Sequence, residues 1–186
     1  MSEAYPTFLA GQRITASLLS SGQPMVARKT ADTSRAAVTA ATADPHLQFQ
    51  ILANAVYIMD GWLKFDGPAA ADINLDWSGP SGILGEWVAY AGGHSPMITF
   101  SNTGVAQLDT QGARGYPMRT ETNDITSARS YGTLGTGLTP LTMSIYGTIR
   151  NGSTAGTYSM DWAQLISDAG NTTIYTDSWL RLQRIA

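Results

Sequence analysis

The sequence predicts an all-β sandwich. Most of the chain after about Pro24 alternates apolar and polar residues with a period of two, and Gly, Asn, Asp and Pro interrupt this alternation at short intervals. With 186 residues, of which 43% are apolar, the chain is long enough for one domain with a sizeable core and a short appendage. No cysteine is present, so stability must come from burial, hydrogen bonding and subunit assembly rather than from disulfides.

About eight to ten strands are expected. The clearest is 141–149, where apolar residues alternate with Thr, Ser and Tyr. Residues 55–65 are apolar on both faces, which is typical of a central strand or of a strand covered by another subunit. Residues 31–43 lack a clear apolar stripe and predict a loop or an edge strand. The other expected strands lie at about 24–29, 47–52, 71–78, 84–91, 96–101, 125–133, 156–165 and 172–184.

Residues 1–23 differ from the rest and predict an N-terminal arm ahead of a sandwich domain at 24–186. Residues 13–20 have apolar side chains at helical spacing and are followed by Gly22, so one small helix is expected there. Such a helix is too short to be stable alone, and its apolar residues need a surface on this sandwich or on another protein. The candidate anchoring residues are Phe8, Leu9, Ile14, Leu18 and Leu19.

Two stretches end in Asp-Trp and align with a single one-residue gap. They are "GWLKFDGPAAADINLDWS" at 61–78 and "GTIRNGSTAGTYSMDWA" at 147–163. Each has an Asp-Gly or Asn-Gly pair between its two apolar alternations, so we interpret the repeat as a hairpin used twice, with a tight positive-φ turn at that pair. The alternation places Trp77 and Trp162 on the packed face and the preceding aspartates on the other face.

Asp76 and Asp161 raise the question of a glycosidase pair. Such chemistry needs two carboxyls about 5 to 10 Å apart, one of them with a raised pKa. Equivalent positions in two hairpins need not converge, and no neighbouring residue in the sequence would raise either pKa. We therefore expect no catalytic residue and no enzymatic activity. Each aspartate is expected to pair with a base such as Lys64 or Arg150, or to accept backbone hydrogen bonds.

Other site chemistry is scarce, and no cofactor is predicted. His46 and His94 have no carboxylate at ligand spacing, so solvated loop histidines are expected rather than a metal site. The Gly-rich stretch 131–140 lacks the Lys-Ser/Thr pair of a phosphate-binding loop and predicts an ordinary loop. A net charge of −3 with scattered basic residues argues against nucleic acid, and no apolar run is long enough for membrane insertion.

Three stretches of the chain resemble a known protein family. They are "FLAGQRITASLLSSGQPMVARKTADTSR", "NAVYIMDGWLKFDGPAAADINLDWSGPSG" and "YGTIRNGSTAGTYSMDWAQLISDAGNTTIYTDSWLRLQRIA". They are similar to small structural proteins encoded by tailed bacteriophages of actinobacteria, in which an opening of the kind F-x-A-G-Q-x-x-T-A-x-x-L precedes a β-sandwich ending on S-W/Y-L-R-L-x-R. The resemblance covers most of the chain and is weakest over about 91–126. Members are usually labelled minor tail, head fibre or capsid decoration proteins.

The resemblance implies a jelly-roll-like antiparallel sandwich in the virion, assembled in the host cytoplasm. It also implies a homotrimer in which aromatic side chains on an outer sheet face form the subunit interface. Candidates for that face, each equally consistent with a core position, are Trp62, Tyr90, Tyr146 and Tyr175. The arm would bind the phage major capsid protein or a tail protein. The leading expectation is a non-enzymatic capsid decoration or head-fibre protein.

Two alternatives remain open at this point. The first is a minor tail protein that acts as a carbohydrate-binding receptor module, in which exposed rings such as Trp62 or Trp87 stack on host cell-surface glycan. The second is a hydrolase of cell-wall glycan, which rests only on the presence of acidic residues near aromatic ones. The phasing of the Asp-Trp repeat disfavours Trp77 and Trp162 as glycan-stacking rings, because it turns both inward.

Overall fold

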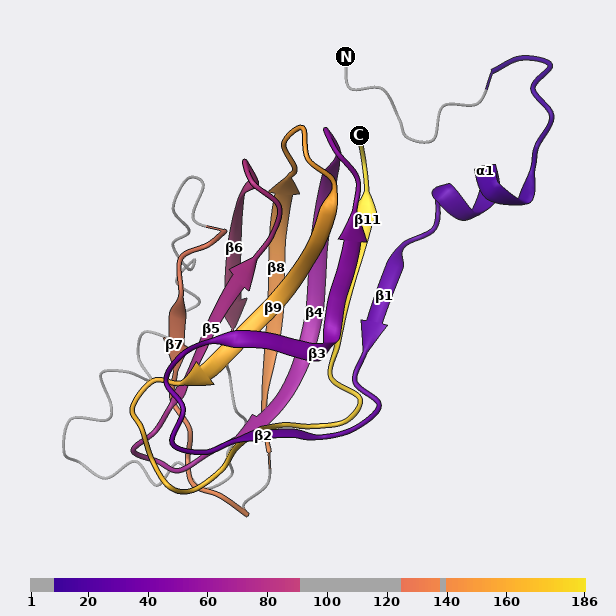
Figure 1. Cartoon of the computed structure of the whole chain (residues 1–186). Helices are drawn as coiled ribbons and strands as arrows, with labels where there is room; N and C mark the ends of the chain where they lie inside the picture. The colour runs from indigo at the N-terminus through magenta and orange to yellow at the C-terminus, as the bar shows by residue number, and fades with distance from the viewer. Residues whose placement is uncertain (1–8, 91–124, 138–139) are drawn as a thin grey trace, which may run out of the picture.

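The computed structural model of the chain describes residues 9–90, 125–137 and 140–186 (Figure 1). The described part contains eleven strands and one helix, α1 (Ala16–Ser21). The strands form two antiparallel sheets that face each other, so the predicted all-β sandwich is confirmed. α1 stands apart from the sandwich, beyond the edge strand β1 (Met25–Arg28).

The larger sheet has seven strands. Five of them form its main path, in the spatial order β1, β11 (Trp179–Arg184), β4 (Val56–Asp66), β8 (Leu141–Arg150) and β6 (Leu84–Tyr90). Two short strands extend the sheet next to the end of β4, namely β10 (Thr172–Ile174) and β2 (Thr33–Arg35). The smaller sheet has the order β3 (Thr42–Ile51), β9 (Gly156–Gln164), β5 (Ile73–Ser78) and β7 (Arg129–Tyr131).

Eight of the strands follow the jelly-roll order. When β1, β3, β4, β5, β7, β8, β9 and β11 are counted from one to eight, the two sheets read 1-8-3-6 and 2-7-4-5. This is the arrangement of two interlocked Greek keys, in which each step between successive counted strands crosses between the sheets, except the step from β5 to β7. β6 adds a further strand beside β8. The jelly-roll-like sandwich expected from the sequence is therefore confirmed.

Two of the expected strands differ from the structure, and a third cannot be compared with it. Residues 172–184 form two strands, because residues 175–178 between β10 and β11 turn, with a φ of 69° at Asp177. The strand expected at 125–133 is only three residues long, as β7. The strand expected at 96–101 lies outside the described residues. Within 31–43, β2 forms at the end of the extended sheet, which agrees with the edge-strand alternative.

The Asp-Trp repeat is not a hairpin used twice, so that prediction was wrong. β4 lies in the larger sheet and β5 in the smaller one, and β8 and β9 are divided in the same way. Neither Asp66-Gly67 nor Asn151-Gly152 has a positive φ. Each pair instead lies in a corner that carries the chain from one sheet to the other. The same alternation and turn residues fit both a hairpin and a corner, because each is a short break between two strands.

The two corner units pair with each other, strand by strand. β4 pairs with β8 and β5 pairs with β9. In the larger sheet Asp60 is directly opposite Tyr146, and these two residues immediately precede the two copies of the repeat. In the smaller sheet Asp76 is directly opposite its equivalent, Asp161. An antiparallel pair in which equivalent residues meet has local two-fold symmetry. The repeat is therefore a symmetric pair that spans both sheets.

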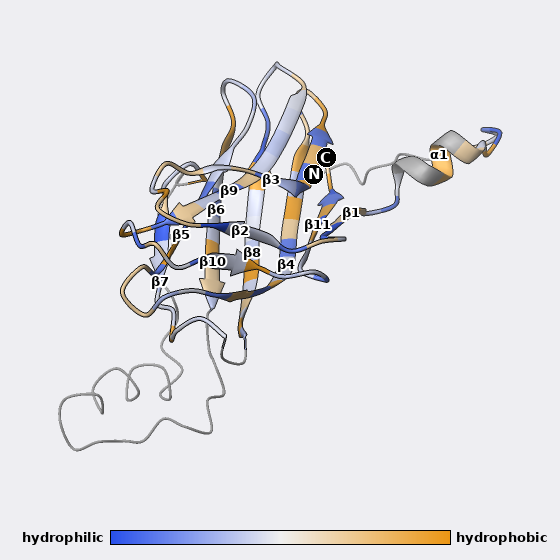
Figure 2. Ribbon diagram, turned by 60° about the horizontal axis from the view of Figure 1, so that its bottom comes forward, coloured by the Kyte–Doolittle hydropathy of each residue, from blue (hydrophilic) through white to orange (hydrophobic). Residues whose placement is uncertain are grey.

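Aromatic side chains join the two sheets in the core. Trp87 of β6 and Trp77 of β5 meet edge to face across the sandwich, with ring centroids 5.6 Å apart. Trp77 also stacks on Tyr158 of β9 at 5.3 Å. Trp77 and Trp162 are both buried, as the alternation predicted. Figure 2 shows the alternation of hydrophobic and hydrophilic residues along the strands that produces this core.

A buried ion pair lies beside Trp162. Lys29 Nζ is 2.7 Å from Asp44 Oδ2, and both side chains are fully buried. Lys29 also donates to the Thr33 hydroxyl at 2.7 Å, and Trp162 Nε1 donates to Asp44 Oδ2 at 3.1 Å. The Arg35 guanidinium covers the Trp162 ring at 4.1 Å from its centroid. The charges are therefore paired and hydrogen-bonded, which is the condition under which buried charges are tolerated.

Candidate functional site

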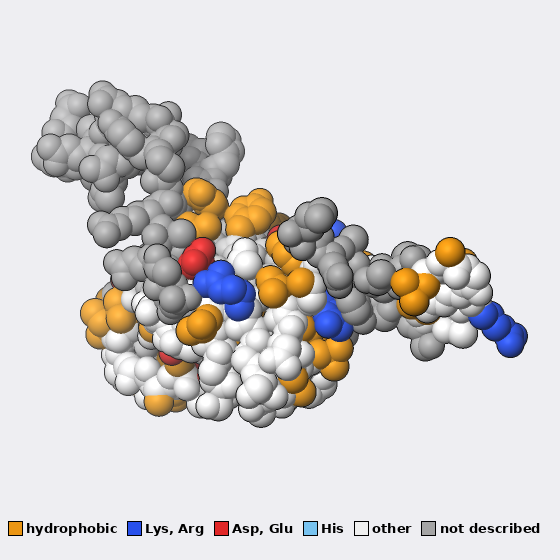
Figure 3. Space-filling model, turned by 90° about the horizontal axis from the view of Figure 1, so that it is seen from above, with side chains coloured by type: hydrophobic (Ala, Val, Ile, Leu, Met, Phe, Trp, Pro, Cys, Tyr) orange, Lys and Arg blue, Asp and Glu red, His pale blue; other side chains and the backbone are white. Residues whose placement is uncertain are grey.

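The N-terminal arm exposes its apolar residues to solvent. α1 begins after Thr15, whose hydroxyl accepts a hydrogen bond from the Leu18 N–H at 3.2 Å in the manner of an N-cap. Leu9, Ile14 and Leu19 are 68%, 61% and 55% exposed. Leu18 is half-buried, and Phe8 lies outside the described residues. Figure 3 shows hydrophobic side chains on the arm, away from the sandwich, so these residues do not rest on their own domain.

Three of the four candidate aromatic residues lie on the outer face of the larger sheet. The burial alternation of β4, β8 and β6 turns Trp62, Tyr146 and Tyr90 away from the core. Tyr90 and Tyr146 contact each other edge to face, with centroids 6.2 Å apart, and both are about half exposed. The fold therefore gathers onto one surface residues that are far apart in the sequence.

Tyr175 contacts the end of β4. It lies between β10 and β11, and its hydroxyl donates a hydrogen bond to Asp66 Oδ2 at 2.6 Å. Burial, together with the hydrogen bond to the Asp66 carboxylate and its negative charge, raises the pKa of Tyr175 to about 12. Tyr175 is therefore tied to the corner after β4.

Sequence reasoning missed several residues of the outer face. Trp179 of β11 is directly opposite Trp62 of β4, and both side chains are half-buried. The signal was present in "SWLRL", where the buried Leu180 and Leu182 imply that Trp179 points outward. Ile58 and Val88 also lie on this face. Trp87, by contrast, is buried in the core, so it is not available as an exposed stacking ring and that expectation was wrong.

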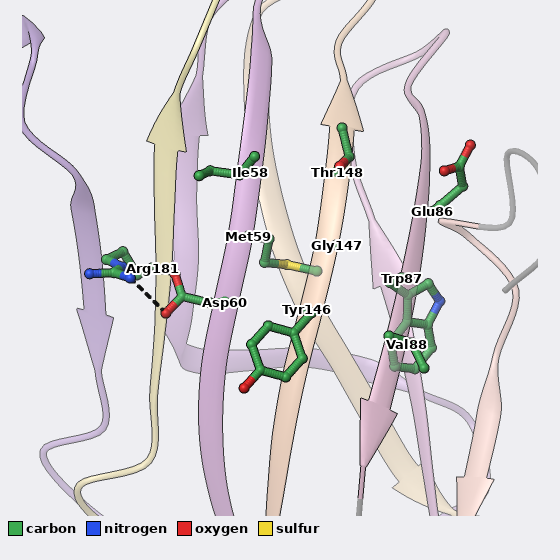
Figure 4. Close-up of a pocket in the computed structure, with 10 residues that line it drawn as sticks. All are labelled: Ile58, Met59, Asp60, Glu86, Trp87, Val88, Tyr146, Gly147, Thr148 and Arg181. Carbon is green, nitrogen blue, oxygen red and sulfur yellow. Dashed lines mark hydrogen bonds and ion pairs between the residues drawn. The ribbon is translucent and has the colours of Figure 1, made fainter. Parts of the chain in front are cut away.

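A groove of about 520 Å³ crosses the outer face over β4, β8 and β6 (Figure 4). Its apolar lining includes Ile58, Val88 and Tyr146. Gly147 lies at its centre between Met59 and Trp87, its partners on the two neighbouring strands. A Cβ at Gly147 would point back into the packed sheet, 2.9 Å from Met59 Cε, so the close strand packing beneath the groove requires glycine there.

Charged side chains lie on two sides of the groove and are already paired. Arg181 of β11 donates two hydrogen bonds to Asp60, from Nε at 2.8 Å and from Nη2 at 2.9 Å. These bonds raise the pKa of the Arg181 guanidinium. On the other side Arg150 Nη2 is 3.3 Å from Glu86 Oε1. The groove therefore combines an apolar floor with a rim whose acids and bases balance.

The smaller sheet brings Asp76 and Asp161 directly opposite each other, although nothing in the sequence required the two positions to converge. Asp161 Oδ1 accepts hydrogen bonds from the hydroxyls of Ser159 at 2.8 Å and Ser78 at 3.1 Å. Asp76 Oδ1 accepts one from the Trp77 N–H at 2.7 Å, so the expected backbone hydrogen bond is present for this residue. Burial and the charge of Asp161 raise the pKa of Asp76, which the sequence did not indicate.

The expected partners of these aspartates lie elsewhere. Lys64 and Arg150 are in β4 and β8 of the larger sheet, whereas Asp76 and Asp161 are in β5 and β9 of the smaller one. Arg150 pairs with Glu86 across β6 and β8 instead. The expected pairing with Lys64 or Arg150 was therefore wrong, because it assumed that the strands before and after each turn were neighbours.

The remaining motifs define no further site. His46 lies half-buried in β3 rather than in a solvated loop, and His94 is outside the described residues. Over 9–90, 125–137 and 140–186, no group of three or more His, Asp or Glu side chains could hold a metal ion. The Gly-rich stretch begins at the last residue of β7 and continues as a loop over 132–137, where Gly135 bridges to Gly67. Among the described helices, none is long and apolar enough to cross a membrane.

Comparisons of the chain with protein-family models, curated proteins and solved structures found no match. The fold and the surface together define a jelly-roll sandwich with an apolar N-terminal arm and a grooved, aromatic outer sheet face.

Proposed function

We propose that this chain is a non-enzymatic bacteriophage virion structural protein, displayed on the particle surface as a trimeric capsid decoration or head-fibre protein. The observation that carries the proposal is the arm, in which Leu9, Ile14 and Leu19 are exposed and make no core contact with the sandwich. Burying a leucine or isoleucine side chain stabilises a complex by about 1.5 to 3 kcal/mol, so the arm has the composition of an anchor for the major capsid protein or a tail protein.

Removal of residues 1–22 tests the anchor. The truncated protein should keep the β-sheet circular dichroism and thermal unfolding of the full chain, because none of the described core residues belongs to the arm. It should no longer join phage particles that lack the wild-type protein. Incorporation of the truncated protein at normal occupancy would show that the arm is not the anchor.

Point variants in a full-length arm test whether incorporation needs the apolar side chains of the arm rather than its length. Ile14→Asp and Leu19→Asp place a charge on the exposed apolar surface and should abolish incorporation, because burying an unpaired carboxylate is strongly unfavourable. Ile166→Asp is the matched control, since Ile166 is 58% exposed but lies on the sandwich. Equal loss of incorporation in all three variants would point to general misassembly instead.

The trimer is proposed to form through the outer face of the larger sheet. Trp62 and Trp179 supply two adjacent aromatic side chains there, and aromatic residues are enriched in subunit interfaces. Light scattering of the purified protein should give three times the mass of the chain, and Trp62→Ala should shift the population toward monomer. A stable wild-type monomer at micromolar concentration contradicts the trimer.

The second candidate function is a minor tail protein that binds host cell-surface glycan. It is supported by the half-exposed rings of Tyr90 and Tyr146, which lie on a sheet face rather than in the core. An electron-microscopy image of phage particles carrying a labelled copy of this protein distinguishes the two candidates, since the label would be found on the head or on the tail.

A further inference from the structure

On the outer face of the larger sheet, side chains from neighbouring strands form rows across the strands, and the groove lies over two of these rows. One row across the strands runs from Arg181 through Asp60 and Tyr146 to Val88. The next row contains Ile58, Thr148 and Glu86. The proposed subunit contact at Trp62 and Trp179 belongs to the row on the other side of Asp60, and neither tryptophan lines the groove. Tyr90, which contacts Tyr146, lies at the far end of that row.

From this arrangement we infer that the groove over Gly147 is a binding site for a neutral saccharide. The inference deepens the second candidate function, and it depends neither on the arm nor on the trimer. A volume of about 520 Å³ falls within the range of roughly 300 to 1,000 Å³ that is typical of small-molecule sites, which allows a short oligosaccharide to occupy it.

Tyr146 provides the surface on which a sugar ring would lie. Its side chain is 50% exposed, and Tyr90 braces the ring edge to face at an interplanar angle of 65°. A tyrosine ring is large and rigid, and binding a ligand to it costs little conformational entropy. The exposed Ile58 extends the apolar floor. The floor therefore matches the apolar C–H face of a pyranose ring.

The rim supplies donors and acceptors for sugar hydroxyls. Arg181 uses Nε and Nη2 to hold Asp60, which leaves further guanidinium N–H donors and carboxylate lone pairs directed elsewhere. Glu86 supplies a second carboxylate on the far side of the groove, and Thr148 adds a hydroxyl. Because the Asp60–Arg181 pair is held in place before any ligand arrives, binding need not order it.

The balanced charges of the rim favour a neutral ligand over an anionic or a cationic one. Asp60 is neutralised by Arg181, and Glu86 by Arg150. An anionic ligand would have to compete with these carboxylates, and a cationic one with these guanidinium groups. A neutral polyhydroxylated ligand can accept from Arg181 and donate to Asp60 without displacing either partner, because a hydroxyl is both donor and acceptor.

Titration with defined oligosaccharides tests the inference. Maltohexaose, cellohexaose and chitohexaose are added separately to the full-length protein labelled with ¹⁵N, and the amide spectrum is followed. At least one probe should bind saturably with a Kd of about 1 mM or tighter, shifting the amides of Tyr146, Gly147 and Val88. Hexagalacturonate, the anionic control of the same length, should bind at least about tenfold more weakly, since the rim offers no net positive charge.

Variants identify the groove as the place of binding. Tyr146→Ala should weaken the best probe by about tenfold or more, whereas Tyr146→Phe should retain the affinity within about threefold because it keeps the ring. Ile166→Ala, at an exposed position outside the groove, is the matched control and should have no effect. Each variant is checked for an otherwise unchanged amide spectrum, so that misfolding is not mistaken for lost binding.

Several results would overturn the inference. It is wrong if no neutral probe binds saturably up to about 10 mM, or if a folded Tyr146→Ala protein binds as tightly as wild type. It is also wrong if the wild type binds no probe while Tyr146→Ala changes the mass found by light scattering, because the groove is then a subunit contact. Loss of saccharide binding leaves the virion role standing, since incorporation into particles is measured separately.

Discussion

Asp76 of β5 and Asp161 of β9 lie directly opposite each other on neighbouring antiparallel strands of the smaller sheet. They are also equivalent residues of the Asp-Trp repeat, so the local two-fold symmetry places like charges together. Directly opposed like charges destabilise a sheet. The hydroxyls of Ser78 and Ser159 donate hydrogen bonds to Asp161, whereas burial and the charge of Asp161 raise the pKa of Asp76.

The first prediction is that Asp76→Asn stabilises the protein at neutral pH. The asparagine oxygen can still accept the Trp77 N–H, while the repulsion from Asp161 is removed. The expected gain in the free energy of unfolding at pH 7 is about 0.5 kcal/mol. Urea denaturation of wild type and variant measures it.

The pH dependence of that gain has a definite sign. The pKa of Asp76 is higher in the folded than in the unfolded protein, so protonation of Asp76 stabilises the folded state. This stabilisation is fully present below the unfolded pKa and is lost as pH rises through the folded pKa. The difference between variant and wild type should therefore disappear below about pH 4. A constant difference from pH 3 to pH 7 would mean that charge repulsion is not its cause.

The second prediction concerns the buried ion pair. Asp44→Ala leaves Lys29 charged and unpaired in the core and should lower the free energy of unfolding by about 3 to 5 kcal/mol. Arg28→Ala is the control, because Arg28 forms an ion pair with Asp177 in which both side chains are more than half exposed, and it should cost less than about 1 kcal/mol. Denaturant unfolding of both variants checks the contrast, and equal costs would contradict it.

The third prediction is that Gly147→Ala destabilises the sheet. An added Cβ would lie 2.7 Å from the Glu86 carbonyl oxygen and 2.9 Å from Met59 Cε, so β6 or β4 must shift. Overpacking of this kind costs about 1 to 3 kcal/mol. Gly132→Ala is the matched control, since its nearest new neighbour would be Asp72 Oδ1 at 3.8 Å. Thermal unfolding should lower the Tm of the first variant only.

The fourth prediction concerns Tyr175. The difference in phenolate absorbance between wild type and Tyr175→Phe should show a group that ionises at about pH 12. Since this folded-state pKa is raised, the contribution of Tyr175 to stability is present below the unfolded pKa of about 10 and is lost as pH rises through the folded value. Asp66→Asn should lower the midpoint, because it removes the carboxylate that accepts the hydrogen bond.

Most of the fold could be predicted from local pattern. Period-two alternation located β4, β6 and β8 to within about two residues, and it placed Trp77 and Trp162 in the core. The short helix also followed from spacing and composition. These features depend on which face of a strand or helix is apolar, and the order of residues within that segment determines this.

Strand pairing could not be predicted in the same way. The alternation of β4 and β5 is the same whether the chain turns back into one sheet or crosses to the other, so the hairpin interpretation was wrong and the partners of Asp76 and Asp161 were misplaced. The groove likewise depends on Arg181, Asp60, Tyr146 and Val88 meeting from four strands. Such neighbours are set by contacts between segments far apart in the chain, whereas the face that a side chain occupies is set by its own strand.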